Sequence, residues 1–316
     1  MIAYILRRLL LLVPVLLIVG IIVFGLMHLT PGDPAAIMLG REATLEQKEA
    51  LRERLGLNDP VPVQFVDWFG NVLRLDFGES LFMNMPVTEA LRNRAEPTGL
   101  LALYALTLSV VIAIPAGVVA AVRANSALDR MLMVVSISGV AIPSFFFCIL
   151  LILLFAVVLG WLPSGGYVDF SDDPGEHFRY MLLPTVALGF SAAGLLARLV
   201  RSTMLDVLNE EYVRTAYAKG LPQRHVVLRH ALRNAAIPVL TVIGISLAGM
   251  LGGAVVIETV FNIPGMGRLL VQSVTRRDFP VVQGAVMIVA AIQIIVMLLI
   301  DVLYAYVDPR IRYGPD

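Results

Sequence analysis

The residues that could support chemistry in this chain are few, and they lack suitable partners. The 316 residues include one cysteine, Cys148, and four histidines. Cys148 lies within an apolar run and has no second cysteine to bond, so we interpret it as a packing residue. His225 and His230 are near each other, but no carboxylate or cysteine stands at ligand spacing from them. The sequence therefore predicts neither a metal site nor a cofactor on this chain.

A serine nucleophile is the next possibility. Gly244-Ile245-Ser246 is similar to part of the signature of intramembrane serine proteases. Such a serine needs a base within hydrogen-bond reach, and no histidine lies in the core of another predicted span. We keep an intramembrane hydrolase only as the last of three alternative functions, because the serine lacks such a base. We interpret the small residues of this segment as helix-packing or pore-bordering positions; they are Gly244, Ser246, Gly249, Gly252 and Gly253.

The chain holds no phosphate-binding loop, since its only lysines, Lys48 and Lys219, lack that context. Gradient-driven carriers usually place ionisable residues inside spans. Here Arg198, Glu258 and Asp301 lie toward span ends. We interpret Arg198 as reaching the inner surface, Glu258 as ending the fifth span and Asp301 as pairing locally. A gradient-driven carrier or channel without ATPase partners is the second alternative.

Composition indicates an all-α polytopic membrane protein. Hydrophobic residues make up 58% of the chain and charged residues 15%, against about 25% charged in soluble domains. The formal net charge is zero, which gives no general attraction for nucleic acid. Because about 20 apolar residues cross a bilayer as helix, we expect six spans. They are 9–29, 99–122, 131–159, 181–200, 235–257 and 281–307, with Pro143 as the cause of a kink in the third.

The positive charges predict the orientation, with both termini in the cytoplasm. Four basic residues lie in the short outer loops: Arg179, Arg268, Arg276 and Arg277. Thirteen lie in the inner flanks: Arg7, Arg8, Arg123, Arg130, Arg198, Arg201, Arg214, Lys219, Arg224, Arg229, Arg233, Arg310 and Arg312. We read 1–29 as a first span rather than a cleaved signal, because its apolar run is long. We expect residues 308–316 to form a cytoplasmic tail.

Residues 30–98 predict a small helical cap outside the membrane. Thr44 and Gln47 form a capping box for a helix that Gly56 can end, and Pro62 can start another. The second helix has an apolar face, which we expect to pack on the bundle rather than on a delivery protein. The face consists of Phe65, Trp68, Phe69, Val72 and Leu73.

The segment between the fourth and fifth spans, 201–235, is far longer than a simple helix connection. Asn209 with the two following glutamates predicts a helix start, and Gly220 predicts a left-handed stop. We expect a second short helix from Pro222 to about Leu232, with His225 and His230 on different faces. Such short helices need a partner to pack against, so the segment 209–233 is predicted to work as a lever on the two spans.

Arg214-Thr215-Ala216-Tyr217-Ala218-Lys219-Gly220 resembles the EAA loop of bacterial ABC importer permeases. Its departures from the general motif look like the dipeptide and oligopeptide branch, as do several other blocks spread over the chain. These are 29–34, Arg54-Leu55-Gly56-Leu57, 211–216, 229–235 and the run from Glu258 to Gly267.

The resemblance implies a type I ABC importer permease fold, and the first (B-type) permease chain of a peptide, glutathione or nickel system in the bacterial inner membrane. It implies a homologous second permease, an extracytoplasmic solute-binding protein and two ATPase subunits, which would hold ATP and Mg. It makes the chain a transport subunit, not an enzyme, and the helix after Gly220 the ATPase-docking helix. The implied coupling residues are Glu211, Arg214, Thr215, Ala216, Gly220, Leu221, Pro222, Arg224, His225, Arg229 and His230.

Overall fold

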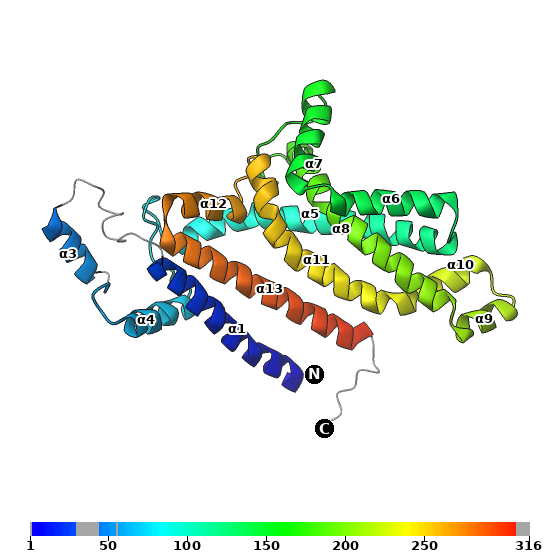
Figure 1. Cartoon of the computed structure of the whole chain (residues 1–316), viewed down its shortest axis with the longest axis horizontal. Coiled ribbons are helices and arrows are strands. Elements are labelled where there is room, and N and C mark those ends of the chain that lie inside the picture. The colour runs from blue at the N-terminus through cyan, green and yellow to red at the C-terminus, as the bar shows by residue number, and fades with distance from the viewer. Residues whose placement is uncertain (1, 30–43, 55, 308–316) are drawn as a thin grey trace. The chain divides into compact units, whose positions relative to one another are not determined.

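The computed structural model describes residues 2–29, 44–54 and 56–307. Within them the named elements are all helices (Figure 1). One isolated bridge joins Glu79 to Pro86. The predicted 30–34 block, Leu55 and the 308–316 tail lie outside the described residues, as do the side chains of Arg7, Arg8, Arg54 and Asp301.

The long helices are α1 (Ile2–Leu29), α5 (Val87–Val122), α8 (Pro174–Leu208), α11 (Leu232–Val260) and α13 (Phe279–Val307). The shorter ones are α3 (Leu45–Arg54), α4 (Val61–Leu73), α6 (Ala127–Ala141), α7 (Ser144–Leu151), α9 (Glu211–Ala218), α10 (Gln223–His225) and α12 (Met266–Arg276). Two π-helical segments, η1 (Ile152–Val158) and η2 (Val226–Ala231), complete the order.

Four helices in the described part are long and apolar enough to cross a membrane: 87–122, 174–208, 223–260 and 279–300. They contain the second, fourth and fifth predicted spans and most of the sixth, and three of them extend well beyond the apolar windows. The extension has a simple cause, since helix hydrogen bonds are made within the segment whether the surroundings are lipid or water. The first predicted span lies in α1. The part of α1 whose side chains are described, Val13–Leu29, is apolar but shorter than the four long helices.

The third predicted span is not one kinked helix. α6 and the α7–η1 helix meet at a bend of 107°, so this pair is either a broken span or a re-entrant segment. The break falls at Ile142-Pro143, where Ile142 leaves helical geometry and Pro143 caps α7. Pro143 does supply the cause, because proline lacks the N–H that a continuous helix would need there. The kink at Pro143 was predicted without an angle, and the structure shows a break of 107° between two helices.

The chain divides into two compact units. One contains residues 1–96 with 268–295, and the other contains 97–267 with 296–316. In the first unit the capping box at Thr44 is confirmed: the Thr44 N–H donates to Gln47 Oε1 at 3.0 Å, and the Gln47 N–H donates to Thr44 Oγ1 at 3.3 Å. Gly56 has a left-handed φ of 65° after α3, as predicted.

The aromatic face of α4 packs on α1. The Phe24 ring centroid lies 5.4 Å from that of Phe65 and 5.5 Å from that of Trp68. Val72 is buried, while Leu73, predicted on the same face, is exposed. The expected packing of this face on the bundle is therefore confirmed except at Leu73.

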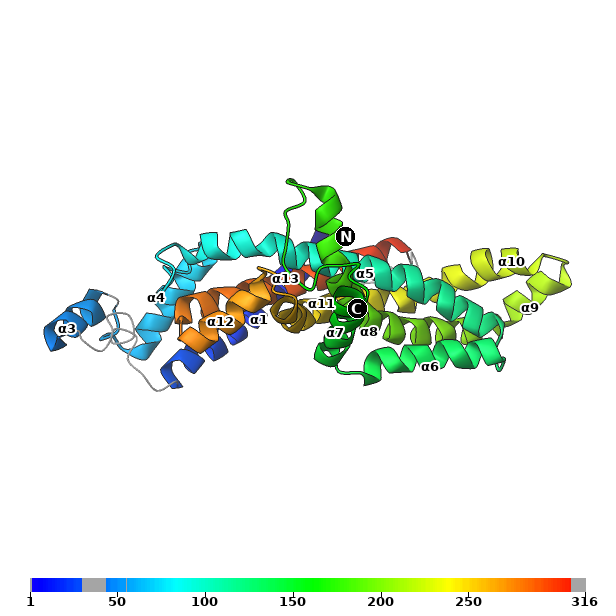
Figure 2. The ribbon, with the colours of Figure 1, turned by 90° about the horizontal axis from the view of Figure 1, so that it is seen from above.

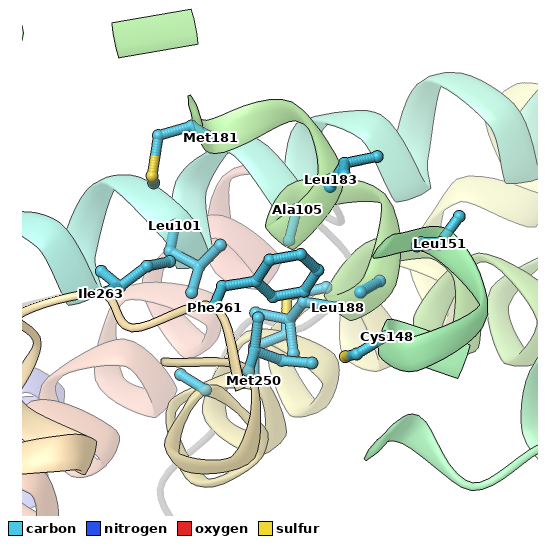
Figure 3. Close-up of a cluster of buried hydrophobic side chains, with 13 residues drawn as sticks. Leu101, Ala105, Cys148, Leu151, Met181, Leu183, Leu188, Met250, Phe261 and Ile263 are labelled. Atoms are coloured by element: carbon cyan, nitrogen blue, oxygen red, sulfur yellow. The ribbon is translucent and has the colours of Figure 1, made fainter. Parts of the chain in front are cut away.

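The second unit is built on α8. One apolar cluster joins α5, α7, α8 and α11, and Figure 3 shows Phe261 and Met250 within it beside Cys148, which is fully buried as a packing residue. A second cluster joins α5, α8, η2 and the start of α11. α6 lies along α8 in both ribbon views (Figures 1 and 2). The approach is close, because a methyl group added at Gly139 would lie 2.8 Å from the Phe190 carbonyl oxygen.

Candidate functional site

The connection between α8 and α11 is a folded element. α9 ends in two hydrogen bonds: the Gly220 N–H donates to Tyr217 O at 2.9 Å, and the Leu221 N–H donates to Ala216 O at 3.3 Å. This pair, with a φ of 79° at Gly220, is a Schellman motif, and it confirms the predicted left-handed stop. Asn209 does not start the helix; it caps the end of α8, and Glu210 is the N-cap of α9.

The second short helix was predicted wrongly. Residues 223–260 form one continuous helix, in which α10 and η2 are the first turns and α11 the rest. Pro222 precedes it as the N-cap, as expected. The π-helical turn also overturns the prediction for the histidines: because i→i+5 hydrogen bonds widen each turn, the rings of His225 and His230 lie 5.6 Å apart.

α9 buries one face and exposes the other. Val213 and Ala216 are buried together with Val226 of η2, and Leu221 packs on this small cluster. Ala216 and Leu221 therefore hold the loop together rather than face outward. The outward positions among the predicted coupling residues are Glu211, Arg214, Thr215, Gly220, Pro222, Arg224 and Arg229, while His225 and His230 are half-buried.

Two tyrosines on the outer face of α9 were not singled out from the sequence. Tyr212 and Tyr217 are each 41% exposed. The Tyr212 hydroxyl accepts a hydrogen bond from Asn234 Nδ2 at 2.6 Å, which ties α9 to the first turns of α11. Tyrosine is enriched among the residues that dominate protein–protein contacts, so two tyrosines in one short helix were a signal available in the sequence.

The surface charges of α9 pair locally. Arg214 Nη1 donates to Glu211 Oε1 at 3.1 Å across one turn, with both side chains mostly exposed. Such pairs contribute little to stability, so α9 owes its place to the apolar cluster and to the Tyr212 contact.

The glycine-rich face of α11 divides into two parts. A methyl group at Gly244 would overlap Ile300 of α13, and one at Gly253 would lie 3.3 Å from Leu188 Cδ1. Added methyl groups at Gly249 and Gly252 would meet no described atom within 4 Å. Ser246 Oγ is buried without a hydrogen-bond partner among the described residues. Gly244 and Gly253 are thus helix-packing positions, and Gly249 and Gly252 line an open side.

A buried group of hydrogen-bonded polar residues, which we call the Glu258 node, lies at the C-terminal end of α11. Glu258 is fully buried, and Thr98 of α5 donates to its Oε1 at 2.5 Å. The Met266 N–H at the start of α12 donates to Thr98 Oγ1 at 2.8 Å. A side chain at Gly265 would overlap the Glu258 carboxylate, which explains why that position carries none. Glu258 lies near the end of its span as predicted, but it joins three helices there.

His177, to which the sequence assigned no role, fixes the segment that precedes α8. Its ring is fully buried, with Nδ1 2.7 Å from Val168 O and Nε2 3.2 Å from the Tyr104 hydroxyl. The Gly166 N–H donates to Phe261 O at 2.7 Å. These contacts hold residues 166–168 onto the helices of the second unit.

A second buried polar contact joins α6 to α8 near the loop that carries α9. Arg201 donates from Nε to Asp129 Oδ1 at 2.6 Å and from Nη2 to Asp129 Oδ2 at 2.7 Å. The sequence analysis had counted Arg201 only as an inner positive charge. No local pattern predicts the pair, because its members are 72 residues apart.

Comparison with known proteins identifies relatives over the whole chain. A family model described as binding-protein-dependent transport system inner membrane component matches residues 113–313. A second model, for the N-terminal part of such membrane components, matches residues 1–93.

Curated relatives align almost end to end. A probable peptide ABC transporter permease protein, y4tP of Sinorhizobium fredii, is 44% identical over 310 residues, covering 98% of this chain and 99% of the relative. The glutathione transport system permease protein GsiC of Escherichia coli is 42% identical over 313 residues, covering 99% and 100%. Among solved structures, the inward-facing MetNI methionine ABC transporter matches with a TM-score of 0.58 at 20% identity, over 72% of this chain and 100% of that chain. At that identity the match shows the fold alone.

The Glu258 node predicts a stability effect. Thr98→Val keeps the shape of the side chain but removes both the donor to Glu258 and the acceptor for Met266 N. We expect it to lower stability by about 1–3 kcal/mol, the cost of a lost buried hydrogen bond. The measurement is the thermal midpoint of the purified protein in nanodiscs.

Thr107→Val is the matched control, since that hydroxyl is exposed and bonds only to Leu103 O of its own helix. Thr98→Ser should recover most of the loss. Equal midpoints for Thr98→Val and Thr107→Val would contradict the role of the node.

Proposed function

This chain belongs to the family of inner membrane components of binding-protein-dependent transport systems, and we propose that it carries short peptides inward as one half of an ABC importer's membrane path. The full-length likeness to ABC permeases, at 42–44% identity, is the observation that carries this function. The relatives' names cover peptides and glutathione, which is itself a tripeptide, so the shared chemistry is a short peptide. The same likeness disfavours a gradient-driven carrier and an intramembrane hydrolase.

The assembly that we propose contains a homologous second permease chain, two ATPase subunits that hold ATP and Mg, and an extracytoplasmic solute-binding protein. The family description supports the binding protein by name. The absence of a phosphate-binding loop in this sequence supports ATP hydrolysis on other chains.

For the membrane topology we propose six spans with both termini in the cytoplasm, a cap of residues 30–98 outside, a core of 99–307 and a short tail. Four long apolar helices, the bent α6–α7 pair and the apolar α1 support the number of spans. The basic residues near 201–235 support the orientation.

Reporter fusions check this topology. Alkaline phosphatase joined after Leu75 should be active, because the enzyme folds only outside the cytoplasm, and green fluorescent protein joined after Asp316 should fluoresce. The reverse pair of signals would overturn the orientation.

For coupling we propose that an ATPase subunit docks on the 209–233 loop, chiefly on the outer face of α9. The sequence interpretation placed docking on the helix after Gly220, but that stretch is the first part of a continuous 38-residue helix. α9 is the separate short helix of the loop, and it exposes Tyr212, Arg214 and Tyr217. Its buried face gives a push on α9 a direct route to the ends of α8 and α11.

Transport by the assembled proteins tests the function. Proteoliposomes with this chain, its permease partner, both ATPases and the binding protein should take up labelled di- and tripeptides when ATP is present inside. A proton or sodium gradient without ATP should drive no uptake. Uptake on the gradient alone, in vesicles lacking the ATPases, would favour the carrier alternative.

Gly220 variants test the docking element. Gly220→Val forces a β-branched residue into a left-handed conformation, while Gly220→Asn supplies a residue that tolerates it. A Cβ atom added at Gly220 meets no described atom within 4 Å, so the two variants differ chiefly in how well they tolerate the left-handed backbone of this turn. A penalty of about 1–2 kcal/mol predicts roughly tenfold weaker ATPase co-purification for Gly220→Val, with Gly220→Asn near wild type.

Membrane insertion, measured as the amount of chain in the membrane fraction, should be equal for both variants. Normal co-purification and uptake with Gly220→Val would count against docking on this loop.

A further inference from the structure

The Asp129–Arg201 pair is fixed more firmly than a surface ion pair. Asp129 is 3% exposed, and the Arg201 side chain is 25% exposed. The guanidinium contacts the carboxylate through two parallel hydrogen bonds, a geometry that defines orientation as well as distance.

Asp129 also organises the turn between α5 and α6. Its Oδ2 accepts from the Asn125 N–H at 2.9 Å, and its own N–H donates to Ser126 Oγ at 3.2 Å. Asn125 itself adopts a left-handed φ of 64°. Through this one carboxylate, the α5–α6 turn, the first turn of α6 and the side of α8 are tied together.

The pair lies close to the proposed docking element. Arg201 precedes the end of α8 at Leu208 by two helical turns, about 10 Å. Met204, between them, is buried in the cluster that also contains Ala121 of α5 and Val227 of η2. A displacement of α9 therefore reaches the ion pair through a continuous packed segment.

A second fixed contact between α6 and α8 lies further along both helices. The Gly139 backbone lies against Phe190 O, and the Gly194 backbone lies against Ser136 O, so close that a side chain at either glycine would overlap the partner helix. The Asp129–Arg201 pair and this glycine packing lie at different positions along α8. Together they prevent α6 from rotating about a single point of contact with α8.

The energetics favour an orienting role. Burying a charge costs several kcal/mol, and here the Asp129 carboxylate is almost fully buried and the Arg201 guanidinium partly so. Apolar residues of similar volume often stabilise a fold as well or better. A buried bidentate pair at this position is therefore better explained by the geometry it imposes than by net stability.

We propose that Asp129 and Arg201 are positioning residues that make α6, with the α5–α6 turn, move as one body with α8 when the docked ATPase displaces α9. Without the pair, α8 tilts while α6 stays behind, and the membrane path opens incompletely for each ATP hydrolysed. The inference rests on the proposed coupling function.

The test compares uptake per ATP in proteoliposomes. Asp129→Asn should keep ATPase co-purification and ATP hydrolysis within twofold of wild type, while peptide uptake per ATP falls about tenfold, within the usual range of coupling between sites. Arg201→Lys keeps the charge but loses the bidentate geometry, so its peptide uptake per ATP should lie between that of Asp129→Asn and that of wild type. Glu176→Gln, which breaks the exposed Glu176–Arg179 pair, is the matched control and should change neither rate.

A distance measurement gives a readout that a merely stabilising role would not move. Spin labels at exposed Val134 on α6 and exposed Asp206 on α8, in a Cys148→Ser background, report the α6–α8 separation. In the otherwise unchanged chain the distance should be the same in the nucleotide-free and ATP-trapped states. In Asp129→Asn it should differ between the states.

Failure of the inference and of the proposed function are distinguishable. If Gly220→Val weakens ATPase co-purification while Asp129→Asn keeps both normal uptake per ATP and an invariant label distance, the positioning role is overturned and docking stands. If Gly220→Val has no effect, the docking proposal fails instead. Should Asp129→Asn not assemble, Arg201→Lys and the exchange Asp129→Arg with Arg201→Asp carry the same comparison, and uptake per ATP at the wild-type level in Arg201→Lys overturns the role.

Discussion

The fold depends first on one constraint: a backbone that crosses lipid must satisfy its N–H and C=O groups within its own helix. A helix that meets this requirement does not stop at the membrane surface, because its hydrogen bonds are already local. α8 continues to Leu208 and the 223–260 helix begins well before its apolar core, so both project beyond the predicted spans. The loop between them is therefore held at the ends of two long helices, which is the mechanical basis of the coupling that we propose.

Polar side chains mark the places where these helices are fixed to one another. Apolar packing holds the helices of a bundle together, but it is non-directional and defines their mutual register less sharply than a hydrogen bond does. Glu258 with Thr98 at one end of α11, and Asp129 with Arg201 beside α8, favour one arrangement, because a displaced partner would break a buried hydrogen bond that depends on direction. The second unit thus combines an apolar interior with a few contacts that define its register.

The sequence predicted what local chemistry determines. The Thr44 capping box, the left-handed stop at Gly220 and the N-cap at Pro222 each follow from residues within a few positions of one another. Pro143 marks the position of the break after α6, but no residue pattern used in the sequence analysis gives its angle of 107° or the π-helical turn that brings His225 to His230. The Asp129–Arg201 pair joins residues that are 72 apart in the chain. Local patterns therefore did not give the mutual positions of the proposed coupling residues.

The small core under α9 decides how the loop can transmit a displacement. An eight-residue helix in water is unstable by itself, and a loop held only by the exposed Glu211–Arg214 pair would yield when pushed. Val213 and Ala216 instead seat α9 on Val226, and Val226 belongs to the first turns of the long α11 helix. The Schellman turn at Gly220 keeps the link between them to a few residues. We therefore expect a displacement of α9 to move the helix that follows it, because a short hydrogen-bonded turn joins the two and they share a packed apolar cluster.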